Sequence, residues 1–197
     1  MAHRARVATL GSPPRTRYKE ARQHAVLEAK FSTCSVQAIL WRCDLSAEAR
    51  LKQLGITLPN VPAPSANYMP YRIAGNLLFL AGQGPRDDNG NNLVGKVGAD
   101  VSLEEGYRRA RIVGLQLLAT TRIALGSLDR VEGVIKMLCM VNAVPEFKDH
   151  PKVGNGMSDL FVEVFGEAGK HARSSVGMGS LPHQISVEIE GIFAIKA

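Results

Sequence analysis

The C-terminal run HARSSVGMGSLPHQISVEIEGIFAI, residues 171–195, decides how the fold of this chain is interpreted. In its second half Val187 and Ile189 alternate with polar residues, which is the period of a β-strand with one buried face. The first half holds one arginine, Arg173, among small side chains and glycines. A turn at residues 181–182 would fold this half back antiparallel to the last strand.

The polar side of the last strand carries two carboxylates, Glu188 and Glu190, about 7 Å apart at two residues of strand rise. If that face is buried, the carboxylates need a cation or a proton. Arg173 is the candidate cation. It could lie within reach of both carboxylates, anchor the carboxylate of a substrate, or form an interface salt bridge with no chemistry.

The upstream segments complete an α+β pattern. Two long helices and five or six strands predict a two-layer domain with both helices on one face of the sheet. The other face then needs a cover, and we expect a second copy of the chain to provide it. We expect a short helix after Ser46, strands at 71–74, 77–81 and 134–142, and long helices over 103–125 and around 157–165.

The charge of the chain is divided unevenly. The 197 residues carry a net charge of +6, and all of the excess lies in residues 1–43. Residues 44–197 contain 16 basic and 16 acidic side chains, so a role in binding nucleic acid is not expected of them. No apolar run reaches the roughly 18–20 residues that cross a membrane, and no membrane partner is expected.

The sequence predicts a division into a basic N-terminal extension, residues 1–44, and a folded domain, residues 45–197. Three interpretations of the extension stay open: a disordered tail, a mitochondrial or plastid targeting segment, or a start codon assigned too early. Three cysteines without metal-binding spacing favour a reducing compartment, with Cys139 as a core thiol. We therefore expect a cytoplasmic protein, or an organellar one if the extension is a transit peptide.

Three segments carry a resemblance to a known family: NYMPYRIAGNLLFLAGQGP (67–85), the helix SLEEGYRRARIVGLQLLATTRIALGSLDRV (102–131), and the C-terminal run 171–195. Together they resemble the RidA/YjgF family of reactive-intermediate deaminases, once labelled endoribonuclease L-PSP. The resemblance implies a chorismate-mutase-like fold with a mixed sheet. It also implies homotrimers whose clefts lie between subunits.

The resemblance also implies a set of site residues. Arg173 matches the arginine that binds the substrate carboxylate, and Glu188 matches the glutamate that activates water. One departure is Ser175, where many members carry cysteine, and another is the glycine-rich stretch VGMGS, residues 176–180. Further substrate-binding positions by the same match are Tyr68, Asn155, Ser174 and Ser175.

The implied activity is the hydrolytic deamination of enamine and imine intermediates, such as 2-imino acids, to 2-keto acids and ammonia. Positioning and one general base are sufficient for such reactive substrates, so no metal or organic cofactor is expected. Two alternatives stay open. The same cleft could bind a small carboxylate metabolite without turnover, or the chain could be an endoribonuclease, which the neutral body does not favour.

Overall fold

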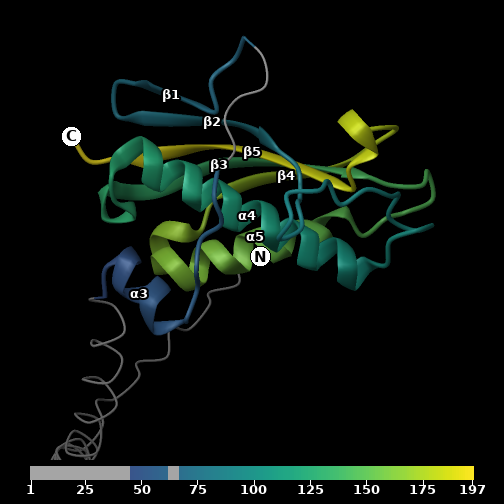
Figure 1. Cartoon of the computed structure of the whole chain (residues 1–197), viewed down its shortest axis with the longest axis horizontal. Coiled ribbons are helices and arrows are strands. Elements are labelled where there is room, and N and C mark those ends of the chain that lie inside the picture. Colours follow the sequence, from purple (N-terminus) through teal and green to yellow (C-terminus); the bar gives the residue numbers. More distant parts are fainter. Residues whose placement is uncertain (1–44, 62–66) are drawn as a thin grey trace, which may run out of the picture. The chain divides into compact units, whose positions relative to one another are not determined.

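Five strands form one mixed sheet in the order β1-β2-β5-β3-β4, in a computed structural model that describes residues 45–61 and 67–197 (Figure 1). Neighbouring strands are antiparallel except for β3 and β4, which are parallel. The predicted extension, residues 1–44, lies outside the described residues. The strands are β1 (Tyr71–Ala74), β2 (Leu77–Gln83), β3 (Val131–Asn142), β4 (Ala172–Met178) and β5 (Val187–Ile195).

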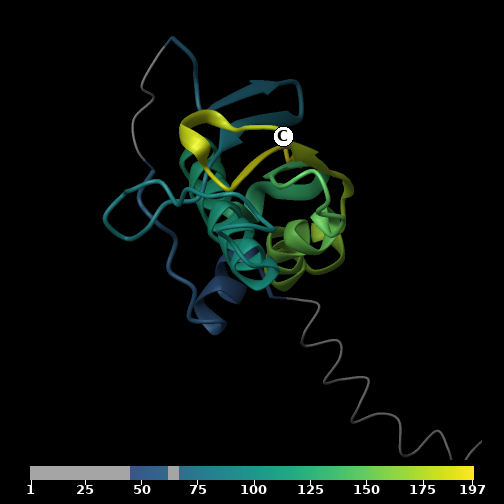
Figure 2. The same cartoon turned by 90° about the vertical axis from the view of Figure 1, so that its right-hand side faces the viewer.

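Two long helices, α4 (Leu103–Leu125) and α5 (His150–Phe165), pack side by side on one face of the sheet (Figure 1, Figure 2). This arrangement confirms the predicted two-layer α+β domain. A short helix precedes the sheet, and three single turns connect the larger elements. These are α3 (Ala47–Gln53), η1 (Leu128–Arg130), η2 (Gly166–Gly169) and η3 (Pro182–Gln184).

Local sequence sets the ends of the helices as expected. Ser102 caps α4, because its hydroxyl accepts a hydrogen bond from the backbone N–H of Glu105 at 3.1 Å. Gly126 ends the same helix with φ +80°, a left-handed conformation that favours glycine. Ser46 caps α3 through the N–H of Ala49. The predicted helix boundaries at Ser46, Ser102 and Gly126 are therefore confirmed.

The core lies between the sheet and the two long helices. Val187 and Ile189 are fully buried there, while Glu188 and Glu190 point to the other face, as the alternation predicted. Phe193 is also fully buried, and its ring packs edge-on against Phe161 of α5 at 5.6 Å between centroids. The last strand thus holds the helices to the sheet by one face and presents carboxylates on the other.

The predicted pairing of β4 was wrong. The segment with Arg173 does not fold back antiparallel to β5; it runs parallel to β3 at the edge of the sheet, and β3 separates it from β5. The reason is the connection through α5, since a strand–helix–strand crossover returns the chain parallel to the first strand. Residues 179–186 then cross to the opposite side of β3 before β5 begins.

The sheet face opposite the helices is left uncovered by the described chain (Figure 1). Phe79 of β2 and Val176 of β4 are each 39% exposed, and Leu138 and Met140 of β3 are partly exposed between them.

None of the helices in residues 45–61 and 67–197 has the length and apolar character that crossing a membrane requires.

Candidate functional site

Arg173 points from β4 towards the helices. It lies opposite Met137, a fully buried residue of the helix-facing side of β3. Its guanidinium makes three hydrogen bonds to the first turns of α5: Nη1 donates to Ser158 Oγ at 2.7 Å, and Nη2 donates to Asn155 Oδ1 at 2.9 Å and to the Pro151 carbonyl at 3.0 Å. All three acceptors are neutral, so the positive charge is oriented but not neutralised.

The Arg173 side chain is half-buried and has no ion pair within the part of the chain that the structure describes. Its guanidinium has five N–H donors, and the contacts with α5 use three of them. Two donors and a full charge are left for an anion. This is the arrangement expected of a carboxylate-binding site, since charge-assisted hydrogen bonds favour such a ligand.

Gly154 of α5 has no side chain, and this leaves room for the Arg173 side chain to pack against the helix. A Cβ at Gly154 would lie 3.3 Å from Arg173 Cζ and 2.6 Å from Ser175 Oγ, so a larger residue would displace both side chains. Ser175 shares the face of Arg173, whereas Ser174 points to the uncovered face, where its hydroxyl accepts a hydrogen bond from Lys136 Nζ at 2.9 Å. The two adjacent serines thus lie on opposite faces of β4.

Cys139, next to Ser175 in the register of β3 and β4, is fully buried. Burial raises the pKa of its thiol to about 12, although the Arg173 charge and the Ser175 hydroxyl partly oppose the shift. A thiol of that pKa is not a nucleophile at neutral pH. The predicted core thiol is confirmed.

Glu188 lies half-buried on the uncovered face, with its carboxylate directly over Gly82 of β2. The register of β2 against β5 shifts between Leu80 and Gln83, and this bulge turns Gly82 towards the glutamate. Burial raises the pKa of Glu188, and the nearby charge of Glu190 raises it further. A carboxylate with a raised pKa is a better proton acceptor at neutral pH than an ordinary one.

Arg173 and Glu188 lie on opposite faces of the sheet. Arg173 aligns with Met137 on the helix side, and Glu188 aligns with Met140 on the uncovered side, with β3 between β4 and β5. The hypothesis of a guanidinium next to both carboxylates within one chain is therefore wrong. The physical reason is that β4 pairs in parallel with β3. This pairing places Arg173 at the edge of the sheet, with β3 between it and the carboxylates of β5.

Of the remaining predicted site residues, the structure brings Asn155 to Arg173 by a direct hydrogen bond. Tyr68 lies just before β1 and is 52% exposed, with no polar contact to the other site residues in the described chain. Sequence reasoning missed Ser158, which accepts a hydrogen bond from Arg173, and the role of His171, whose Nε2 is 3.0 Å from Ser158 Oγ. The period of two in His171, Arg173 and Ser175 is the signal that links the histidine to the arginine.

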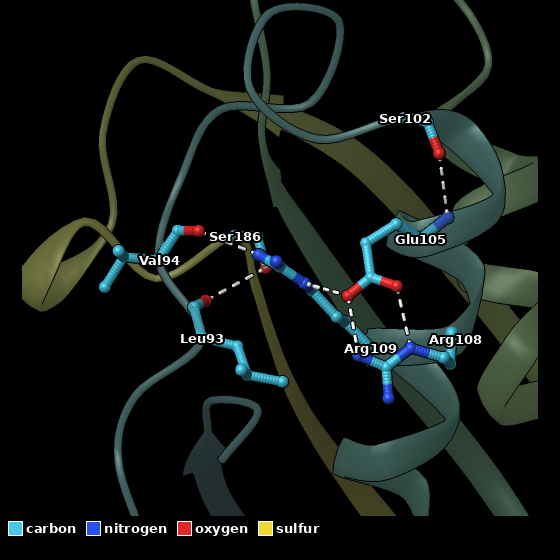
Figure 3. Close-up of polar contacts among 7 residues, drawn as sticks. All are labelled: Leu93, Val94, Ser102, Glu105, Arg108, Arg109 and Ser186. Carbon is cyan, nitrogen blue, oxygen red and sulfur yellow. Dashed lines mark hydrogen bonds and ion pairs between the residues drawn. The ribbon is translucent and has the colours of Figure 1, made fainter. Parts of the chain in front are cut away.

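A second polar cluster lies at the N-terminal end of α4 (Figure 3). The Glu105 carboxylate accepts hydrogen bonds from Arg108 and Arg109, and Arg109 donates onward to the Val94 carbonyl at 2.8 Å and to Ser186 Oγ at 3.2 Å. These contacts lower the pKa of Glu105 to about 2. Both arginines share the one carboxylate, and Arg109 ties α4 to two connecting segments, so we interpret the cluster as serving the fold.

Comparisons with known proteins identify the family. The model of the family described as "YjgF/chorismate_mutase-like, putative endoribonuclease" matches residues 48–189. The chain belongs to this family, which confirms the resemblance to RidA/YjgF proteins and the chorismate-mutase-like fold.

Individual relatives agree with this result. "Protein TCP17" of Trypanosoma cruzi is 42% identical over 149 residues, which cover 75% of this chain and 93% of the relative. The solved structure of Atu1372 from Agrobacterium tumefaciens, a protein of unknown function, is 44% identical with a TM-score of 0.70, covering 76% of this chain and 92% of that one. A structure titled as a putative endoribonuclease from Shewanella oneidensis is 33% identical with a TM-score of 0.73, covering 77% and 100%.

Proposed function

We propose that this protein is a hydrolytic deaminase of 2-imino acids that works at a cleft between two copies of the chain. The observation that carries the proposal is the Arg173 guanidinium, which is oriented by neutral acceptors on α5 and keeps two N–H donors and its charge available. Membership of the YjgF family supports the proposal, because this chain resembles the reactive-intermediate deaminases of that family. The uncovered sheet face, with exposed Phe79 and Val176, supports association of copies into a homotrimer.

In this mechanism Arg173 binds the carboxylate of the 2-imino acid and fixes the C=N carbon at the cleft. Glu188 of a neighbouring copy accepts a proton from a water molecule as the water oxygen attacks that carbon. With the imine nitrogen protonated in the substrate, this gives a neutral carbinolamine with one C–O and one C–N bond. When the C–N bond breaks, the glutamate returns its proton to nitrogen, and the carbinolamine hydroxyl loses its proton to solvent as the C=O bond forms, so that ammonia leaves and a 2-keto acid remains.

The test is an assay of ammonia and keto-acid release from freshly generated 2-aminoacrylate, compared with the spontaneous rate. Arg173→Ala should lower kcat/KM at least about tenfold, because a hydrogen-bonded charge contact to the substrate is lost. Arg130→Ala is the matched control, since Arg130 is exposed and its side chain bonds only the Lys196 carbonyl among the described residues. An Arg173→Ala protein as fast as the parent would contradict the assignment.

A binding role without turnover is the second candidate, and Ser175 in place of the cysteine of many relatives favours it. Calorimetry with 2-ketobutyrate separates the two. Binding that Arg173→Ala abolishes, together with no turnover by the parent protein, would replace the deaminase with a carboxylate-binding module. The charge balance of residues 44–197 gives no support to RNA as the ligand.

A further inference from the structure

His171 lies directly before β4, half-buried, with its ring edge-on to Phe161 at 6.0 Å between centroids. Its Nδ1 is 2.7 Å from the Gly169 carbonyl oxygen, and its Nε2 is 3.0 Å from Ser158 Oγ. A carbonyl oxygen can only accept a hydrogen bond, so Nδ1 must carry a proton. The geometry therefore fixes which ring nitrogen is the donor.

The second nitrogen of His171 is an acceptor. Burial lowers the pKa of His171 most. The hydrogen bond to the Gly169 carbonyl raises this pKa in part, and the nearby charge of Arg173 lowers it again, so the ring is neutral at physiological pH. In the neutral ring with a proton on Nδ1, Nε2 holds a lone pair. Ser158 must then donate its hydroxyl proton to that lone pair.

This direction decides how Ser158 meets Arg173. With its proton given to His171, the serine oxygen turns its lone pairs towards Arg173 Nη1, which donates at 2.7 Å. The other acceptor for the hydroxyl, the Gly154 carbonyl, lies farther away at 3.3 Å. The three side chains thus form one directed chain, in which the arginine donates to the serine and the serine donates to the histidine.

We propose that Ser158 and His171 are positioning residues for the Arg173 anion site. Asn155 and Pro151 hold Nη2, and Ser158 is the partner of Nη1, so the serine fixes the plane of the guanidinium. His171 fixes the serine. The identity of the anion as a 2-keto or 2-imino acid rests on the proposed function, whereas the directed chain does not.

Two substitutions of His171 distinguish the roles of its two ring nitrogens. Glutamine places a side-chain oxygen near the position of Nε2 and can still accept from Ser158, whereas asparagine reaches only the position of Nδ1. His171→Asn and Ser158→Ala should weaken binding of 2-ketobutyrate about 5- to 20-fold. This is less than the roughly 10- to 150-fold value of a direct hydrogen bond to a charged group, because both residues act on the ligand through Arg173. KM for the imino acid should rise with little change in kcat. His171→Gln should stay within about twofold of the parent.

Thermal unfolding of each variant checks that the fold is intact. Equal weakening by His171→Gln and His171→Asn, or parent-like binding by Ser158→Ala, would overturn the proposal. A ligand-free measurement tests the chain separately: the imidazole ¹⁵N chemical shifts of His171, assigned by their absence from His171→Gln, should show a protonated Nδ1 and a bare Nε2 at pH 7. The other tautomer, or an imidazolium, would refute the directed chain.

These readouts distinguish the two proposals. If the parent protein fails to bind 2-ketobutyrate and to turn over imino acids, the proposed function fails, and the tautomer of His171 still decides the positioning role. If the parent binds and the tautomer is reversed, the proposed function stands and the positioning role fails.

Discussion

Replacing Gly82 by alanine should damage catalysis while leaving the fold intact. Gly82 lies at the bulge of β2, beneath the carboxylate of Glu188. A Cβ built there overlaps Glu188 Oε1 and lies 3.1 Å from the carboxyl carbon and 3.3 Å from Cγ. The carboxylate must therefore move away from β2 to make room for one methyl group.

The size of the effect follows from what has to move. The overlapping atoms are the far end of a flexible side chain on an exposed sheet face, so the free energy of unfolding should change by less than about 1 kcal/mol. Relief of the overlap displaces the carboxylate by roughly 1 Å. For the general base that we propose Glu188 to be, a misplacement of that size costs up to about 100-fold in rate. We expect a large fall in kcat without a comparable loss of stability.

The assay is kcat for imino-acid hydrolysis, measured beside the denaturant midpoint. Gly133→Ala is the matched control, because Gly133 also lies in a strand of this sheet and a Cβ there meets only the Ala168 carbonyl oxygen, at 3.6 Å. The control should keep its kcat. The reasoning is refuted if Gly82→Ala turns over like the parent, or if its activity falls only in proportion to the unfolded fraction.

Three further predictions concern stability and reactivity. The pKa of Glu105 in the folded protein is about 2, below its ordinary 4.5. Its contribution to the free energy of unfolding is therefore present above pH 4.5 and is lost as the pH falls towards 2. With solvent screening this amounts to about 1 kcal/mol, and Glu105→Gln should flatten the acid limb of a stability–pH profile. Phe193→Ala should cost about 3–5 kcal/mol in denaturant unfolding, because a fully buried ring is removed; a loss below 1 kcal/mol would be inconsistent with this packing. Cys139 should resist thiol reagents at pH 8 until the protein unfolds, and peptide-resolved labelling of the native protein at that residue would disprove its burial.

The sequence predicts which side chains of a strand are buried, because successive residues of a strand point to opposite faces of the sheet. The alternation around Val187 and Glu188 placed the apolar residues against the helices and the carboxylates on the open face, as observed. The long helices were equally clear from their caps and apolar stripes. These patterns depend only on residues close together in the chain.

The neighbour of β4 was not predictable from the same patterns. An alternating segment shows which way its side chains point but not which strand it pairs with, and the turn residues near Leu181 favoured a hairpin that does not form. The order strand–helix–strand from β3 through α5 was the better indicator, because such a crossover gives parallel neighbours.

The residues around Arg173 depended on this pairing. Asn155 was found by family resemblance, but Ser158 and His171 become its neighbours only when α5 lies beside the edge strand. Hydroxyl and imidazole groups are common on helix surfaces and strand ends, so neither residue type was informative alone. Their role is visible only in the direction of the hydrogen bonds.

The most direct test of a site shared between copies is subunit complementation. Arg173→Ala and Glu188→Gln chains with different affinity tags are co-expressed, and mixed trimers are purified through both tags. In the proposed trimer every cleft takes its arginine from one copy and its glutamate from the next, so about one third of the clefts in a mixed trimer should be intact. The predicted result is recovery of about one third of the parent kcat, and activity no higher than that of the two variants alone would contradict a cleft built from opposite faces of two sheets.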